Sequence, residues 1–190
     1  MSYQLARCSP NYVIGSIPTF KRFCSDNDLP LNTMSNFDII RIAKQLKIKY
    51  FRGVYMRDSL PKTIRTNECG IVNLEPESEN GSHWCCYYKK GSKKYYFDSY
   101  GLDPTNEMLK YLKQNNPKSE VIMNTYEIQK FGTVICGQIS LYVLFMLSHD
   151  HQFIDILLSL MTEFNGKTGG DLNDDIEAVD SIATIAELLL

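Results

Sequence analysis

One stretch of the chain combines residue types that are suited to thiol chemistry. It runs "ENGSHWCCYYKKGSKKYYFDSYG", residues 79–101, and places His83 two and three residues before Cys85 and Cys86. The whole chain has only three histidines and six cysteines. An imidazole beside a thiol can take the thiol proton and return it later in a reaction. His83 is therefore a candidate general base, and the question is which cysteine it serves.

The residues around His83 predict a β-hairpin, because two aromatic runs, "HWCCYY" and "KYYFD", flank a turn that contains Gly91. With an even loop, at residues 90–91 or 89–92, His83 lies directly opposite Asp98. A carboxylate there accepts the imidazole N–H and stabilises the imidazolium. An odd loop pairs His83 with Ser99 and turns Asp98 to the other face. The sequence leaves both registers open, and in the second His83 and Asp98 are only polar neighbours.

Cys136 is the best candidate for the thiol. Cys85 shares the face of His83 but lies about 7 Å along the strand, and Cys86 points to the other face, so both are predicted to be small buried hydrophobic residues. Cys136 follows the loop "QKFGTVI" and opens an apolar helix, whose free N–H groups and positive end favour a thiolate. Gly137 is expected to leave room for a substrate. The alternative is a buried cysteine at a helix start.

Gln129 is a candidate for the stabilisation of negative charge. It lies seven residues before Cys136. Its amide can donate an N–H to a developing oxyanion, and the backbone N–H of Cys136 can supply a second donor. Taken alone, such a glutamine is most often a surface residue.

The length and composition of the chain exclude several classes of protein. A chain of 190 residues is about one domain, and its formal net charge of -2 does not indicate nucleic-acid binding. The cysteines form no C-x-x-C pattern, so we expect neither a zinc site nor a disulfide framework, and reduced thiols fit best. We expect no metal at His149 and His151 either, because no third ligand is near. The start has no signal-peptide pattern, and the longest apolar run, residues 135–147, is too short to span a membrane.

The pattern of the chain predicts one α+β domain with a mixed, mostly antiparallel central sheet flanked by helices. Residues 1–34 are expected to be an extended N-terminal arm, 35–165 a catalytic core and 171–190 a C-terminal helix. Ser35 and Asp38 form a capping-box pattern at the first core helix. The run from residue 136 to 149 is apolar nearly all round, which predicts a buried central helix with Cys136 at its N-terminus.

These motifs together resemble a known family. H-W, then F-D-x-Y-G with Asp98 fifteen residues after His83, then Q-x6-C-G opening an apolar helix, is similar to the adenain-type cysteine proteases. That family comprises the adenovirus maturation endopeptidase and its relatives in virophages and Polinton elements. The string "FRGVYMRDSLP…ECGIVNLEPESENGSHW…YYFDSYGLDP" most resembles the virophage and Polinton branch of mavirus-like proteases. The resemblance covers residues 35–148 in order.

The resemblance implies a role for each matching residue. His83 matches the general base, Asp98 its orienting acid and Cys136 the nucleophile. Gln129 matches the oxyanion donor, and Trp84 the aromatic residue that packs beside the catalytic pair. The acid of the adenoviral enzyme is a glutamate, so Asp98 follows the wider group, which includes proteases of ubiquitin-like proteins.

The resemblance also implies a biological role. Such an endopeptidase processes capsid and other structural precursor proteins during virion maturation, in the virion and the host cytoplasm, and we expect a monomer that binds no membrane. The residues call for no cofactor. The adenoviral enzyme uses DNA and a disulfide-linked peptide, but no cysteine lies between Cys86 and Cys136 to tether one on that stretch.

Two other functions stay open at this point. One is a deubiquitinase-like or SUMO-protease-like isopeptidase with the same chemistry, and the other is a non-catalytic scaffold with the same fold. Gly169 and Gly170 in the tail are predicted to be a hinge, with self-cleavage there as the alternative.

Overall fold

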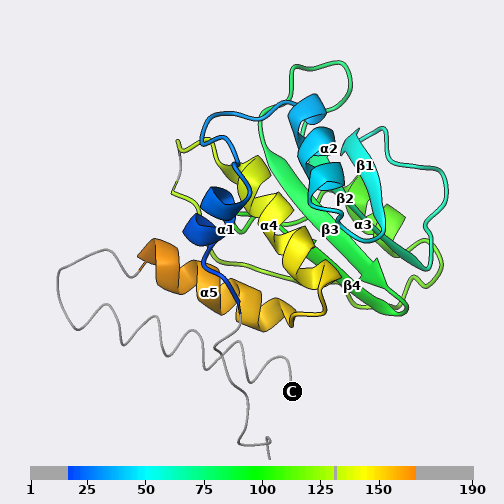
Figure 1. Cartoon of the computed structure of the whole chain (residues 1–190). Coiled ribbons are helices and arrows are strands. Elements are labelled where there is room, and N and C mark those ends of the chain that lie inside the picture. Colours follow the sequence, from blue (N-terminus) through cyan, green and yellow to red (C-terminus); the bar gives the residue numbers. More distant parts are fainter. Residues whose placement is uncertain (1–16, 131, 166–190) are drawn as a thin grey trace, which may run out of the picture.

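A mixed five-stranded sheet organises the part of the chain that the computed structural model describes, residues 17–130 and 132–165. Helices cover both of its faces (Figure 1). The strands are β1 (Phe51–Met56), β2 (Asn67–Asn73), β3 (Trp84–Lys90), β4 (Lys93–Phe97) and β5 (Ile122–Met123). The helices are α1 (Phe20–Asp26), α2 (Asn36–Gln45), α3 (Asn106–Leu112), α4 (Cys136–Ser148) and α5 (Phe153–Asn165).

The strands follow one another across the sheet in the order β1-β2-β3-β4-β5. The three middle strands pair antiparallel, whereas the edge strands β1 and β5 join in parallel. The parallel step from β4 to β5 passes through α3, as such a connection requires a crossover. The predicted α+β class with a mixed sheet is confirmed.

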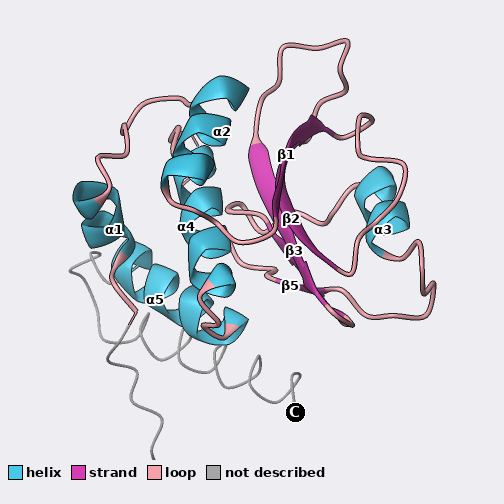
Figure 2. Cartoon of the chain, turned by 45° about the vertical axis from the view of Figure 1, so that its right-hand side comes forward, coloured by secondary structure: helices cyan, strands magenta, loops and turns pink. Residues whose placement is uncertain are grey.

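The helices divide unequally between the two faces of the sheet. Figure 2 shows α1, α2, α4 and α5 on one side and α3 alone on the other. Every residue of α4 except Phe145 is buried, because other helices and the sheet surround it. The prediction of a buried central helix that begins at Cys136 is thus confirmed, and this helix anchors the larger of two apolar clusters.

The start of α2 has the capping box that the sequence predicted. The Ser35 hydroxyl accepts a hydrogen bond from the Asp38 N–H at 3.2 Å, and the Asp38 carboxylate accepts one from the Ser35 N–H at 3.0 Å. These bonds satisfy two backbone donors that the helix leaves unpaired. They fix the position at which the chain enters α2.

The prediction of an extended arm is wrong for part of residues 17–34. The chain forms α1 there, with Thr19 as its N-cap, and the rings of Phe20 and Phe23 pack edge-on against Tyr142 of α4. The scattered prolines suggested an extended chain, but the apolar face of this short helix is buried against α4, and that burial outweighs the local pattern. Residues 1–16, the predicted helix at 171–190 and Gly169-Gly170 lie outside the described residues.

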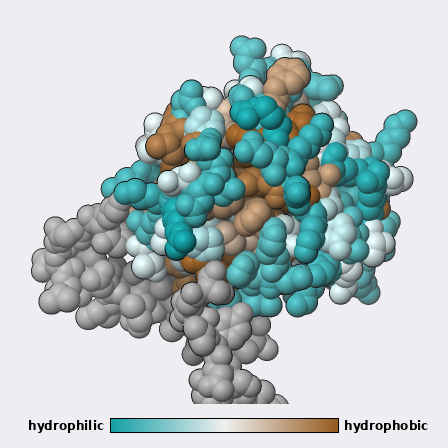
Figure 3. Space-filling model, viewed as in Figure 1, coloured by the Kyte–Doolittle hydropathy of each residue, from teal (hydrophilic) through white to brown (hydrophobic). Residues whose placement is uncertain are grey.

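Polar side chains dominate the surface. Figure 3 shows them around a band of apolar surface that crosses the middle of the face in view. Among the described residues, no helix combines the length and the apolar character needed to cross a bilayer.

Candidate active site

The hairpin that carries His83 has an even loop, but its register differs from the predicted one. The loop is Gly91-Ser92, so that Lys90 pairs with Lys93 and Cys86 with Phe97. If this register is continued, Asp98 lies opposite Cys85 and not opposite His83. The even loop still keeps Asp98 on the face of His83, and the two side chains meet on the diagonal, which long side chains can span.

His83 and Asp98 form a buried ion pair. The Nε2 of His83 lies 3.0 Å from Oδ2 and 3.1 Å from Oδ1 of Asp98. His83 is 5% exposed and Asp98 is fully buried. Because a carboxylate only accepts hydrogen bonds, Nε2 carries the proton, and Nδ1 is left as the reactive nitrogen. That Nδ1 is buried and has no hydrogen-bond partner of normal geometry among the described residues.

Neighbouring groups hold this pair in place. The backbone N–H of Tyr100 donates to Asp98 Oδ1 at 2.7 Å, and the Tyr100 ring stacks on the imidazole with ring centroids 4.4 Å apart. The buried Asn124 accepts from the Asp98 N–H at 3.0 Å and donates to its carbonyl at 2.6 Å. We did not predict either role from the sequence. Only the place of Tyr100 in the F-D-x-Y-G motif could have suggested its role.

The surroundings favour the charged form of His83. Burial by itself lowers the pKa of an imidazole, but the hydrogen bond and charge of Asp98 and the nearby Cys136 outweigh it. They raise the pKa of His83 from its usual 6.5 to about 9. At neutral pH the ring is therefore an imidazolium.

Cys136 occupies the predicted position at the start of α4, and the structure brings it to the same groove as His83. The N-cap residue Ile135 supplies no side-chain hydrogen bond, so no cap covers the first-turn N–H groups, which include that of Cys136. Cys85 and Cys86 are each 1% exposed, and burial raises the pKa of both thiols. They are buried residues of β3, as predicted.

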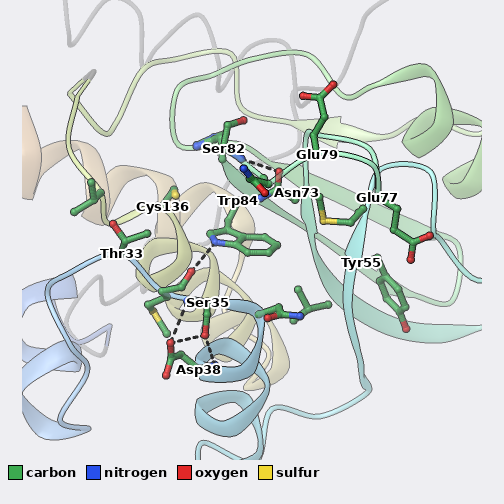
Figure 4. Close-up of a pocket in the computed structure, with 18 of the residues that line it drawn as sticks. Thr33, Ser35, Asp38, Tyr55, Asn73, Glu77, Glu79, Ser82, Trp84 and Cys136 are labelled. Atoms are coloured by element: carbon green, nitrogen blue, oxygen red, sulfur yellow. Dashed lines mark hydrogen bonds between the residues drawn. The ribbon is translucent and has the colours of Figure 1, made fainter.

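A groove of about 750 Å³ runs past Cys136 and His83. Its walls come from residues 33–38, the end of β1 and the loop that joins β2 to β3, and Trp84 lies in its middle (Figure 4). Gly137 is not among the described residues that line the groove, and its role in substrate access stays a prediction. A Cβ at that position would lie in ordinary contact with Trp84, Ile39 and Met34, at 3.4–3.5 Å.

Two side chains next to the catalytic candidates hold one wall of the groove. The buried Gln138 donates to the carbonyls of Pro30 at 2.5 Å and Asn32 at 2.8 Å, and Trp84 Nε1 donates to the Met34 carbonyl at 3.0 Å. All three bonds run to main-chain carbonyls of one irregular segment. We did not predict this clamp, because a polar residue in an apolar run gives no indication of its partner.

Gln129 lies near the groove but does not line it. Its side chain is fully buried and accepts from the Ser99 hydroxyl at 2.8 Å. Its amide N–H groups are directed to the Thr133 carbonyl at 2.7 Å and the Tyr100 hydroxyl at 3.5 Å. An oxyanion would have to compete with these acceptors, so the role of Gln129 stays a prediction.

No metal site adds to this arrangement within the described ranges. There, no group of three or more His, Cys, Asp or Glu side chains could hold a metal ion.

Comparisons with known proteins give structural likeness without sequence likeness. No family model matches the chain, and a search of curated proteins found no significant match. A crystal structure of the ASFV pS273R protease is similar, with a TM-score of 0.45 and 13% identity over 70% of this chain and 66% of that chain. A selenomethionine crystal structure of the same protease gives 0.47 and 14%, over 70% and 67%. The chain thus spans about two thirds of the length of the ASFV protease. We therefore take the function from the side chains themselves.

Proposed function

We propose that this chain is a cysteine endopeptidase. The observation that carries the proposal is the buried imidazole of His83. One nitrogen is bound to Asp98, and the other has no hydrogen-bond partner among the described residues and lies at the groove that Cys136 also lines. A base oriented by a carboxylate beside a thiol at a helix start is the arrangement that nucleophilic catalysis requires.

The proposed reaction is shared between the sulfur of Cys136 and the imidazole of His83. Nδ1 of His83 holds the proton of the Cys136 thiol, and the sulfur reacts as the thiolate. The sulfur attacks the peptide carbonyl carbon, and the backbone N–H of Cys136 donates to the oxyanion. As the C–N bond breaks, Nδ1–H protonates the leaving amine. The neutral imidazole then takes a proton from water, whose oxygen attacks the thioester. The C–S bond breaks, which releases the acid and returns Cys136 as a thiolate beside the imidazolium.

Asp98 acts on this cycle through His83. It fixes the ring so that Nδ1 points away from the carboxylate, and it stabilises the imidazolium that donates the proton. Gln129 is the second oxyanion donor in this proposal, provided that a bound substrate draws its amide away from Thr133.

The proposed substrates are capsid precursor proteins, cut in the virion or the host cytoplasm during virion maturation. This part of the proposal, like the assignment to the virophage and Polinton branch, is supported by the sequence resemblance over residues 35–148. The same resemblance makes DNA a candidate activator. A monomer suffices for the chemistry, because the three catalytic candidates come from one chain.

Two measurements on wild type and Cys136→Ala test the proposal. Each protein is incubated with the precursor coat protein, and new N-termini are identified by mass spectrometry. We expect cuts by the wild type only, and equal cleavage by both would refute the proposal. Turnover of a ubiquitin-like fluorogenic substrate without any cut in the coat protein would instead favour the isopeptidase.

Alkylation tests the thiolate without a substrate. At pH 6 only about 0.3% of an ordinary thiol is ionised, so a preformed thiolate should react with iodoacetamide on the order of 100-fold faster. We expect fast labelling of Cys136 and a much slower reaction in His83→Gln. Equal rates in these two proteins would favour the non-catalytic scaffold.

A further inference from the structure

The charged side chains that line the groove beside Cys136 are mostly of one sign, which is negative. The described residues that line it include the carboxylates Asp38, Glu77 and Glu79 but no lysine or arginine. The other ionisable groups among these described lining residues are His83, Cys136, Tyr55 and Tyr100. The wall residues therefore impose a negative potential on whatever peptide enters.

The three carboxylates are not equivalent. Asp38 is committed to the start of α2, where it bonds Ser35 and lies 3.7 Å from Arg41. The side chains of Glu77 and Glu79 are exposed and make no hydrogen bond or ion pair with any described residue. Within the part of the chain that the structure describes, they are the two groove carboxylates without a partner.

An ordered loop presents these two glutamates. The buried Asn73 side chain ties both ends of the loop, because its Oδ1 accepts from the N–H of Glu75 at 3.0 Å and of Ser82 at 3.1 Å. The N–H of Glu77 also donates to Asp58 at 2.9 Å. These three bonds fix the backbone from which the two glutamate side chains project.

The glutamates and the nucleophile lie on different sides of Trp84. In Figure 4 Cys136 lies on one side of the indole, and Glu77, Glu79 and Tyr55 lie on the other. The reacting end of the groove is marked by Cys136 and by the buried Nδ1 of His83, which has no hydrogen-bond partner among the described residues. A peptide whose scissile bond lies at Cys136 and whose chain crosses Trp84 would bring a side chain several residues away to these carboxylates, since an extended chain advances about 3.3 Å per residue.

We infer that Glu77 and Glu79 select peptides with a lysine or arginine a few residues from the cleaved bond. This specificity rests on the proposed endopeptidase function. A basic side chain long enough to reach the loop gains two charge interactions there, and an acidic one at the same position is repelled. The aromatic face of Tyr55 in the same part of the groove also suits a cation.

The test is a cleavage profile of the full chain. The probe is a peptide library made from a cell lysate by cutting after glutamate, which preserves internal lysine and arginine. Wild type, Cys136→Ala and Glu77→Gln/Glu79→Gln are compared, with Glu107→Gln/Glu120→Gln as the control. The control removes the same charge from exposed positions that do not line the groove.

We expect the wild type to enrich lysine and arginine at one fixed position two to five residues from the cut. The Glu77→Gln/Glu79→Gln protein should still cut but lose this enrichment, with kcat/KM on a basic peptide lowered about three- to tenfold, as exposed ion pairs are weak. The difference should shrink at high salt. The control should match the wild type.

The two proposals fail in different ways. Cleavage that depends on Cys136 without positional enrichment, or with enrichment that survives the loss of both glutamates, would overturn this inference and leave the endopeptidase intact. The absence of any Cys136-dependent cleavage would overturn both.

Discussion

Two ion pairs with fully buried carboxylates lie in different parts of the molecule, and they differ in what surrounds them. At the groove beside the start of α4, His83 meets Asp98 at 3.0 Å. Next to α3, Arg52 meets Glu68 at 2.7 Å, with side chains that are 14% and 1% exposed. Both pairs join a cation and a buried carboxylate at a similar distance, so distance alone does not tell them apart.

The hydrogen bonds around each pair separate them. Arg52 Nη1 also donates to the Thr63 carbonyl and the Tyr111 hydroxyl, and Glu68 accepts from the Arg65 N–H and from Tyr111. These bonds tie β1, β2, α3 and the connecting chain together. His83, in contrast, keeps one buried nitrogen at a groove without a hydrogen-bond partner among the described residues. The bonds around Arg52 and Glu68 serve to hold the structure together, whereas a nitrogen left open beside a thiol can exchange a proton.

The largest effect should come from Asp98→Asn. This variant keeps the size of the side chain but allows the other imidazole tautomer, so Nδ1 is no longer reliably the base. We expect kcat to fall by about 10³-fold with little change in KM. Steady-state kinetics on a cleaved peptide measures it. A loss below tenfold would mean that the carboxylate does not orient the ring.

Glu68→Gln should lower the stability and leave catalysis unchanged, which is the opposite of the effect of Asp98→Asn. It removes the charge from the buried carboxyl group and leaves the partly buried Arg52 without its charge partner, which should lower the free energy of unfolding by about 1–3 kcal/mol. Urea unfolding measures the change, and kcat per folded molecule should stay at the wild-type value. A loss of kcat with unchanged stability would erase the contrast between the two pairs.

The pH dependence should reflect the raised pKa of His83. Below about 9 the ring is protonated and can donate to the leaving amine, whereas above that value the proton is lost. We therefore expect kcat/KM to fall tenfold per pH unit above about 9, and the ring signals of His83 in NMR to titrate in the same range. In Asp98→Asn this midpoint should move to lower pH. An unshifted midpoint would show that Asp98 does not stabilise the imidazolium.

The smallest effect should come from weakening the clamp, the hydrogen bonds that Gln138 and Trp84 donate to main-chain carbonyls of residues 30–34. Gln138→Leu keeps an apolar helix but removes the donors to Pro30 and Asn32, so the wall at residues 33–38 loses support. We expect KM to rise about three- to tenfold with kcat within a factor of two, because the loss of one or two hydrogen bonds changes binding by about 1 kcal/mol. Gln138→Glu, which keeps acceptors but no amide donors, should behave like the leucine variant. A fall in kcat alone would argue against a role in binding.

Local patterns were enough for several elements. The capping box at Ser35 and Asp38, the presence of a hairpin and the buried helix from Cys136 depend on neighbours in the sequence, and the structure confirms them. The hairpin register differs from the predicted one. The arm was mispredicted because the helix in it is stabilised by a distant contact, the packing of Phe20 and Phe23 on α4. The helix propensity of this short segment was too weak by itself to predict α1.

By itself, the sequence determined which groups could react and in which elements they lie, because residue type and periodicity are local properties. It also limited the residue predicted to lie opposite His83 to two cases, one for an even and one for an odd hairpin loop. Only the tertiary structure decided the rest: a register that makes the contact of His83 with Asp98 diagonal, the diversion of the Gln129 amide to Thr133, and the placement of two unpaired glutamates across Trp84 from Cys136. Each of these depends on which distant segments pack together, and no spacing along the chain encodes that.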